Sequence, residues 1–154
     1  SKSGIIVKGL YDVAVHFSKC CSPVPGDEIV GFVTRGRGVS IHRTDCINVI
    51  NLPEDERGRL IDAEWQVAEN PTSTEQYSTE IQIFANNRIG LFADISKVFT
   101  EKQIDITSMN VRTSKQGRAT IIMTFDIHGT EELNRITDKI RQIDGVLDIQ
   151  RTTG

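Results

Sequence analysis

Every second position from Ala119 to Ile127 holds an apolar side chain, a pattern that is typical of a strand with one buried face. The three residues Lys115–Gly117 just before it have the composition of a short turn. A strand on the other side of such a turn runs antiparallel to the first. The pattern therefore predicts a β-hairpin in the last third of the chain.

The strand before this turn changes parity along its length. Ile104 and Ile106 occupy one parity, whereas Met109 and Val111 occupy the other. Because a slip of one residue moves a side chain to the opposite face of a sheet, this change predicts a β-bulge near residues 107–108.

Two segments around the hairpin have helical periodicity. The first begins after Gly90, and the second is expected to be capped by Thr130 and closed by Gly145. Their predicted buried stripes are Leu91, Phe92, Ile95, Val98 and Phe99, and then Leu133, Ile136, Ile140 and Ile143.

A strand over residues 77–85 precedes the first helix, and a short strand beginning at Val146 follows the second. The order is β-α-β-β-α-β, which predicts a four-stranded antiparallel sheet with both helices on one face, the ferredoxin-like arrangement. The other face then lacks a helical cover and is available for pairing with a second copy, another protein or RNA.

Residues 68–76 are small and polar and contain one proline, so we predict a linker there. It separates a domain at 1–67 from a domain at 77–154, and the whole chain is α+β. The first domain is expected to be small and β-rich, with a loop over 22–27 and a turn over 35–38. Its expected strands are Val13–Val15, 29–34, 39–43 and 60–65, and Thr44 or Asp45 would cap a brief helix over 46–50.

The first domain contains the donor set of a tetrahedral zinc site. Cys20, Cys21, His42 and Cys46 offer three sulfur atoms and one imidazole. Neighbours in an extended chain point in opposite directions, so both thiols of Cys20 and Cys21 reach one ion only if the chain turns at 22–23. The alternative is that these cysteines are small buried residues and His42 is a strand histidine with its own partner.

A basic stretch lies between Gly31 and Arg43. It contains Arg35, Arg37 and Arg43 and no acidic residue. A forked guanidinium binds phosphate at two points, and glycine lets a backbone come close, so RNA is the candidate partner. A solvated turn is the alternative.

The loop Asn86–Leu91 joins the first strand of the second domain to its helix. Free N–H groups at the start of a helix can hold a carboxylate, and Gly90 permits the close approach that this requires. We therefore consider the loop a candidate amino-acid site. The alternative is that Gly90 only makes the turn.

Bulk composition excludes some classes of protein. A net charge of −3 argues against coating of nucleic acid through bulk positive charge, and no apolar run approaches the roughly 20 residues that span a bilayer. Three cysteines in the first third of the chain are unlike the paired framework of a secreted mini-protein, so we expect a reducing cytoplasm. The absence of an initiator Met suggests a piece of a longer protein.

The run HFSKCCSPVPGDEIVGFVTRGRGVSIHRTDCIN, from His16 to Asn48, resembles the conserved-cysteine region of long RelA/SpoT-type proteins. Residues 77–154, with NNRIGLFADIS and ITSMNVRTSKQGRA, resemble the ACT domain that ends the same proteins. Together the two resemblances cover nearly the whole chain, in the family's order.

The resemblance implies a regulatory fragment of an enzyme that makes, and often degrades, the alarmones ppGpp and pppGpp. The fragment resembles neither catalytic region of the family, so we expect no catalytic residue in it. The cysteine domain of this family is also called a zinc-finger or ribosome-intersubunit domain, which implies contact with ribosomal RNA and tRNA. We assign that contact to Arg35, Arg37 and Arg43, and a possible structural zinc to the cysteine cluster.

ACT domains resemble one another in binding small amino acids between two copies, and some Rel-type proteins are thought to bind branched-chain amino acids in this way. The resemblance thus implies a homodimer and valine, isoleucine or leucine as ligand. It carries ligand contacts onto Asn87, Ile89, Gly90, Leu91 and Phe92, faced by Met109 and Asn110 from the following strand. Ile89 stands where many ACT domains have proline, which frees another N–H and loosens the loop.

Two alternatives remain open at this point. One is a pure RNA-docking or ribosome-docking module whose sheet binds no small molecule. The other is a fold in which zinc has a structural role only.

Overall fold

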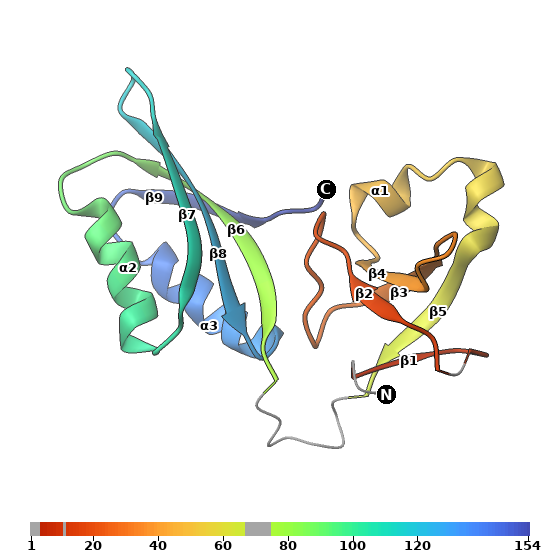
Figure 1. The fold of residues 1–154 in the computed structure, drawn as a ribbon. Coiled ribbons are helices and arrows are strands. Elements are labelled where there is room, and N and C mark those ends of the chain that lie inside the picture. Colours follow the sequence, from red (N-terminus) through yellow and green to blue (C-terminus); the bar gives the residue numbers. More distant parts are fainter. Residues whose placement is uncertain (1–3, 11, 67–74) are drawn as a thin grey trace. The chain divides into compact units, whose positions relative to one another are not determined.

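The chain divides into two compact units in the computed structural model (Figure 1). The first comprises Ser1–Glu75 with Thr153–Gly154, and the second comprises Gln76–Thr152. The structure describes residues 4–10, 12–66 and 75–154. The predicted linker at 68–76 lies almost entirely outside the described residues, so the predicted boundaries at 1–67 and 77–154 stay predictions.

A five-stranded sheet forms the first unit, with the strand order β1-β5-β3-β4-β2. Strand β2 pairs with β4 in parallel, and the other neighbours are antiparallel. A short helix α1 and a 3-10 helix η1 connect β4 to β5. The bounds are β1 Ile5–Val7, β2 Val15–Phe17, β3 Ile29–Val33, β4 Val39–Arg43, α1 Ile47–Ile50, η1 Glu54–Arg59 and β5 Leu60–Trp65.

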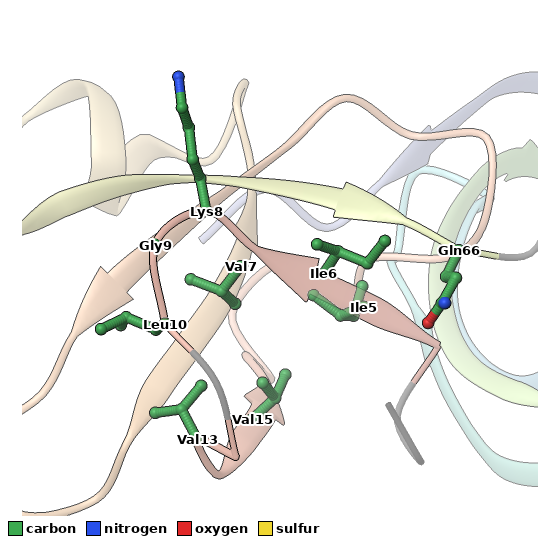
Figure 2. Close-up of a pocket in the computed structure, with 9 residues that line it drawn as sticks. All are labelled: Ile5, Ile6, Val7, Lys8, Gly9, Leu10, Val13, Val15 and Gln66. Atoms are coloured by element: carbon green, nitrogen blue, oxygen red, sulfur yellow. The ribbon is translucent and has the colours of Figure 1, made fainter.

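The sheet of the first unit curls around a small apolar core. Phe17 on the edge strand β2 stacks on Trp65 of β5, with the ring centroids 5.6 Å apart. Strand β5 is the neighbour of β1, the other edge strand. Between the two edges lies a groove of about 310 Å³ (Figure 2). Its lining is Ile5, Ile6, Val7, Lys8, Gly9, Leu10, Val13, Val15 and Gln66. Strands β1 and β2 thus approach one another without pairing.

The second unit confirms the predicted ferredoxin-like order. Its sheet has the strand order β7-β8-β6-β9 with all neighbours antiparallel, and both helices lie on one face (Figure 1). The bounds are β6 Tyr77–Asn86, α2 Leu91–Glu101, β7 Ile106–Thr113, β8 Arg118–Ile127, α3 Thr130–Arg141 and β9 Val146–Arg151. Between sheet and helices, Phe99 and Phe125 meet edge to face at 4.8 Å.

The parity change in β7 is a β-bulge, as predicted. Ile106 pairs with Phe125, but Ser108 already pairs with Thr124, so Thr107 is the extra residue. Its hydroxyl donates to the carbonyl of Thr124 at 3.0 Å, which ties the bulge to β8.

The predicted end of α3 and both predicted caps were wrong. Thr130 is already helical and Gly129 precedes it, while the Glu132 carboxylate reaches back to accept the N–H of His128 at 2.9 Å. The helix ends at Arg141, and Gly145, with φ +99°, instead makes the turn into β9. In the first unit Cys46 occupies the cap position of α1, without a side-chain cap bond, in place of Thr44 or Asp45.

Candidate functional site

The structure brings the four predicted metal ligands together in the first unit. The Sγ atoms of Cys20, Cys21 and Cys46 and one ring nitrogen of His42 all lie within 4.8 Å of one another. They come from three places: the turn after β2, strand β4, and the residue that precedes α1.

A turn of the backbone allows two adjacent cysteines to face the same point. The N–H of Ser22 donates to the carbonyl of Ser18 at 2.9 Å, and Ser22 itself has a left-handed φ of +47°. The chain does turn here, but over residues 18–22, whereas the turn was predicted at 22–23. Within it the two Sγ atoms of Cys20 and Cys21 are 4.0 Å apart.

Four of the distances within this cluster are close to those around a tetrahedral zinc ion. Bond lengths of about 2.3 Å to sulfur and 2.0–2.1 Å to nitrogen place two sulfurs about 3.8 Å apart and a sulfur and a nitrogen about 3.6 Å apart. The Sγ atom of Cys20 lies 3.5 Å from His42 Nδ1 and 3.4 Å from Cys46 Sγ. His42 Nδ1 lies 3.9 Å from Cys21 Sγ, and none of the three cysteines is in a disulfide.

Neighbouring groups orient the cluster. Ser40 Oγ lies 3.1 Å from His42 Nε2, which leaves Nδ1 to face the thiols. Ser18 Oγ lies 2.9 Å from Cys20 Sγ, and the backbone N–H of Arg43 donates to Cys21 Sγ at 3.3 Å. Such outer contacts fix the geometry of metal ligands in proteins.

The titration of the cluster differs from one member to the next. Burial raises the pKa of the Cys21 and Cys46 thiols, and for Cys21 it outweighs the hydrogen bond from the Arg43 N–H. At Cys20 burial also acts to raise the pKa of the thiol. Hydrogen bonds, chiefly with Ser18 and Asn48, outweigh this effect, so the pKa of Cys20 is lowered. Burial lowers the pKa of His42, which favours the neutral imidazole that binds metals. A metal must therefore displace protons from the two buried thiols.

Arg43 is not on the same surface as the other two predicted RNA-binding arginines. Its side chain is 7% exposed, Nη1 donates to the carbonyl of Cys21 at 3.2 Å, and Nη2 lies 2.6 Å from a carboxylate oxygen of Asp45. Strand alternation is the reason, because Arg43 shares the buried parity of Val39 and Ile41 in β4. Arg43 therefore supports the cysteine turn and is not available as a surface contact.

Arg35 and Arg37 are both exposed on the turn between β3 and β4. Arg59, which the sequence analysis did not select, lies beside the same hairpin. Its guanidinium carbon is 4.5 Å from the ring centroid of Phe32, and its Nε donates to the carbonyl of Val33 at 2.9 Å. The sequence feature that could have identified Arg59 is its position just before β5. That strand pairs with β3, so Arg59 comes close to the β3–β4 hairpin.

The loop before α2 is held by Arg88, another residue that the sequence analysis passed over. Its Nε donates to the carbonyl of Asp144 at 2.8 Å, and its Nη2 lies 2.8 Å from the carboxylate of Asp94. Gly90 has a φ of +83°, and Ile89 is fully exposed. Of two further predicted ligand residues, Asn87 on this loop is exposed, and Phe92 in the first turn of α2 is half-buried.

Leu91, another of the predicted ligand residues, does not present its side chain to solvent. It is fully buried, because it is the first residue of the apolar stripe of α2. Its place in the core leaves the loop backbone as the accessible part of this candidate site.

One copy of the chain does not bring Met109 and Asn110 to this loop. Met109 pairs with Met123, which pairs with Ile81, whereas the loop begins only after Asn86. Five positions along a strand correspond to about 16 Å. Because of this distance, a site that joins either residue to the loop needs a second copy. Met109 and Asn110 are adjacent in β7 and point to opposite faces of the sheet.

The chain thus consists of two modules: a curled sheet with a cluster of three thiols and an imidazole, and a ferredoxin-like unit. Residues 5–66 match the RelA/SpoT RIS domain family, and residues 73–151, about half of the chain, match the ACT domain family. No described helix is long and apolar enough to cross a membrane.

Curated relatives match nearly the whole length of this chain. The GTP pyrophosphokinase of Streptomyces coelicolor is 39% identical over 150 residues, which is 97% of this chain and 17% of the relative. That of Escherichia coli K12 is 36% identical over 151 residues, 97% of this chain and 20% of the relative. The crystal structure of the ACT domain from GTP pyrophosphokinase of Chlorobium tepidum is 22% identical, with a TM-score of 0.45 over 50% of this chain and 99% of that one.

The chain therefore belongs to the RelA/SpoT family, in which it corresponds to the regulatory C-terminal region with a RIS domain and an ACT domain. It spans about a fifth of the length of the curated relatives that it matches.

Proposed function

We propose that this region regulates a cytoplasmic GTP pyrophosphokinase by reporting amino-acid starvation. In this proposal the ACT domain binds a branched-chain amino acid between two copies of the chain, and the RIS domain contacts ribosomal RNA and tRNA. The parent makes, and in some family members also degrades, ppGpp and pppGpp. Its catalytic residues lie in the part of the parent that this chain does not span. The names of the curated relatives support the parent activity.

The observation that carries the proposal is the exposure of strand β7. It is an edge strand, and seven of its eight residues are exposed. Met109 and Val111, which are 37% and 38% exposed, pair with buried residues of β8 and so lie on the helix side of the sheet. An exposed edge with apolar side chains suits pairing with a second copy.

A second copy would also supply the ligand residues that one copy lacks. The backbone N–H groups at the start of α2 suit the carboxylate of an amino acid, because a helix N-terminus favours negative charge. On the helix side of β7, Met109 of the second copy offers an apolar contact to an aliphatic side chain. Its Asn110, on the opposite face, offers an amide oxygen to the ammonium group of a ligand that lies across the strand edge.

For the RIS domain we propose that the metal cluster is structural and positions the hairpin that carries the arginines. Strand β4 links the two features, since it begins just after the Arg35–Gly38 turn and contains His42. Zinc at the cluster would supply a rigid four-coordinate crosslink between the cysteine turn, β4 and the start of α1. Arg35, Arg37 and Arg59 would then contact phosphates.

The experiment that tests the amino-acid clause is calorimetric titration of the purified chain with valine, isoleucine and leucine, with lysine as control, at fixed salt and pH. We expect saturable binding of the branched amino acids and loss of binding in Asn110→Ala, whose side chain is exposed. Gly90→Pro should also abolish binding, because proline cannot adopt the φ of +83° found there. Absence of heat with every amino acid would refute this clause.

A second candidate function is an RNA-docking module without a small ligand. The separation of Met109 and Asn110 from the loop in one copy favours it. It requires salt-dependent RNA affinity that falls in Arg35→Ala and Arg37→Ala, together with no heat of valine binding.

A further inference from the structure

Two thiols from distant parts of the RIS domain lie close enough to react with one another. The Sγ atoms of Cys20 and Cys46 are 3.4 Å apart, closer than those of Cys20 and Cys21, at 4.0 Å. A disulfide bond is about 2.05 Å long, so closure requires an approach of about 1.4 Å. We propose that hydroperoxides oxidise Cys20 and Cys46 to an intramolecular disulfide, and that this bond abolishes metal binding by the cluster.

Exposure decides which thiol a peroxide meets first. Cys20 is partly exposed on its turn, whereas Cys21 and Cys46 are 1% and 0% exposed. Cys20 is therefore the attacking thiol, and Cys46 is the resolving thiol behind it. Cysteines that respond to oxidants commonly combine an accessible thiol with such a neighbour.

The reaction balances with the peroxide as the only oxidant. The sulfur of Cys20 attacks one peroxide oxygen, the O–O bond breaks, and an alcohol or water leaves with one proton, so that Cys20 becomes a sulfenic acid. The sulfur of Cys46 then attacks the Cys20 sulfur, the S–O bond breaks, and water leaves with the proton of the Cys46 thiol. Two thiols have lost two electrons, and the peroxide has gained them.

The local geometry disfavours the other partner for Cys20. Cys21 is its neighbour in the chain, and a disulfide between adjacent residues needs a distorted peptide link. In addition, Cys21 Sγ accepts the N–H of Arg43 at 3.3 Å, and the Arg43 side chain holds the Cys21 carbonyl at 3.2 Å. These contacts direct Cys21 away from exchange and leave the pair of Cys20 and Cys46.

The disulfide and the metal exclude one another. Thiolates bind zinc, and a disulfide removes two of them, which leaves only Cys21 and His42 of a site that needs four donors. The disulfide does not rest on the proposed function, because it forms in metal-free protein as well, whereas the loss of metal binding rests on the proposed metal site. Where metal is bound, oxidation releases it.

The test is to treat the reduced chain with hydrogen peroxide, once after chelation and once loaded with zinc. Remaining thiols are then alkylated, and tryptic peptides are analysed by mass spectrometry. Cleavage after Lys19, Arg35, Arg43 and Arg57 puts Cys20 with Cys21 in one peptide and Cys46 in another. We expect these two peptides to be linked with the loss of two hydrogens, and only Cys21 to be alkylated. In the zinc-loaded sample a chromogenic chelator should detect one equivalent of released metal.

Matched variants identify the pair without ambiguity. Cys21→Ser should form the link as fully as the parent chain, whereas Cys20→Ser should form none. Reductant should restore three alkylatable thiols in the parent chain. Formation of the link in Cys20→Ser but not in Cys21→Ser, or oxidation to sulfinic acid without any link in the parent chain, would overturn the assignment. Both results are obtained without RNA or amino acid, so they are independent of the proposed function.

Discussion

The backbone N–H of Arg43 donates to Cys21 Sγ at 3.3 Å, while the guanidinium of the same residue donates to the Cys21 carbonyl at 3.2 Å. Arg43 thus holds one cysteine of the cluster at two points. The side chain is buried, yet its partner Asp45 has a side chain that is 60% exposed. Loss of the guanidinium therefore leaves a buried carbonyl without this donor, but does not leave a buried charge unpaired.

We expect Arg43→Met to destabilise the RIS domain by about 1–3 kcal/mol, the range for a buried polar group that loses its hydrogen bond. Urea unfolding followed through Trp65, which lies in this domain, would measure the change. Arg37→Met is the matched control, because Arg37 is exposed and should alter stability by less than about 0.5 kcal/mol. The effect on RNA affinity should be reversed: Arg37→Met should weaken RNA binding more than Arg43→Met does. Equal stability of the two variants would contradict the role of Arg43.

Removal of metal should weaken the RIS domain selectively. A ligand that binds only the folded state stabilises it by about 4 kcal/mol at a free concentration 1,000 times its Kd. We therefore expect a chelator to lower the Tm of the Trp65 signal and to leave the unfolding of residues 76–152 unchanged. Ser40→Ala should keep the four donors but weaken metal binding by about 10–100-fold, since Ser40 orients His42. No shift of Tm after chelation would contradict a structural metal.

Acid should destabilise the metal-free RIS domain through His42. Burial lowers the pKa of His42 in the folded chain, so the folded state binds fewer protons than the unfolded state. The stability that neutral His42 contributes is complete above about pH 6.5, the ordinary pKa of histidine, and is lost as the pH falls through the lowered value. Unfolding free energies measured between pH 7.5 and 5 should show this decline, and His42→Gln should reduce it. A decline of the same size in the variant would exclude His42 as the cause.

Much of the second domain was predictable because its elements are long and its apolar periods are clear. The stripe of α2 and the alternation in β8 identified their buried faces, and the parity change in β7 identified the bulge at Thr107. The helix ends were not predictable in this way. The Glu132 carboxylate binds the N–H of His128, and this local contact overrode the preference of Thr130 for a cap.

The cysteine donor set was visible in the sequence, but its supports were not. Arg43 follows the buried parity of β4, which conflicts with the usual exposure of arginine, and only the three-dimensional placement of Asp45 and the Cys21 carbonyl explains it. Strand β1 was missed because three residues, Ile5–Val7, are too few to show a period.

Two glycines of the hairpin that carries Arg35 and Arg37 should respond very differently to alanine. Both have left-handed φ values, +84° at Gly36 and +76° at Gly38. A Cβ at Gly36 meets nothing within 4 Å, so Gly36→Ala should cost only the conformational strain of about 1 kcal/mol.

A Cβ at Gly38 would overlap the carbonyl oxygen of Ala14, which also accepts the N–H of Val39 at 2.8 Å. The parallel pairing of β2 with β4 must shift to relieve this overlap, so Gly38→Ala should cost more than Gly36→Ala by about 1–3 kcal/mol. Urea unfolding of the two variants checks the order. An equal cost would show that β2 moves freely against β4.

Self-association through β7 predicts that charge on this edge separates the copies. Val111 is 38% exposed and pairs with the buried Ile121, so a lysine there projects from the helix side of the edge strand without entering the core of one copy. Val111→Lys should therefore leave the Tm of the dilute chain within a few degrees of its parent, but place two like charges near each other wherever β7 pairs with a second β7. Sedimentation velocity at several concentrations should show a shift from dimer to monomer, and valine binding should weaken in step. Lys115→Ala, at the exposed tip of the adjacent turn, is the control that should change neither. A variant that remains dimeric and binds valine as its parent does would place the contact between copies elsewhere on the ACT domain.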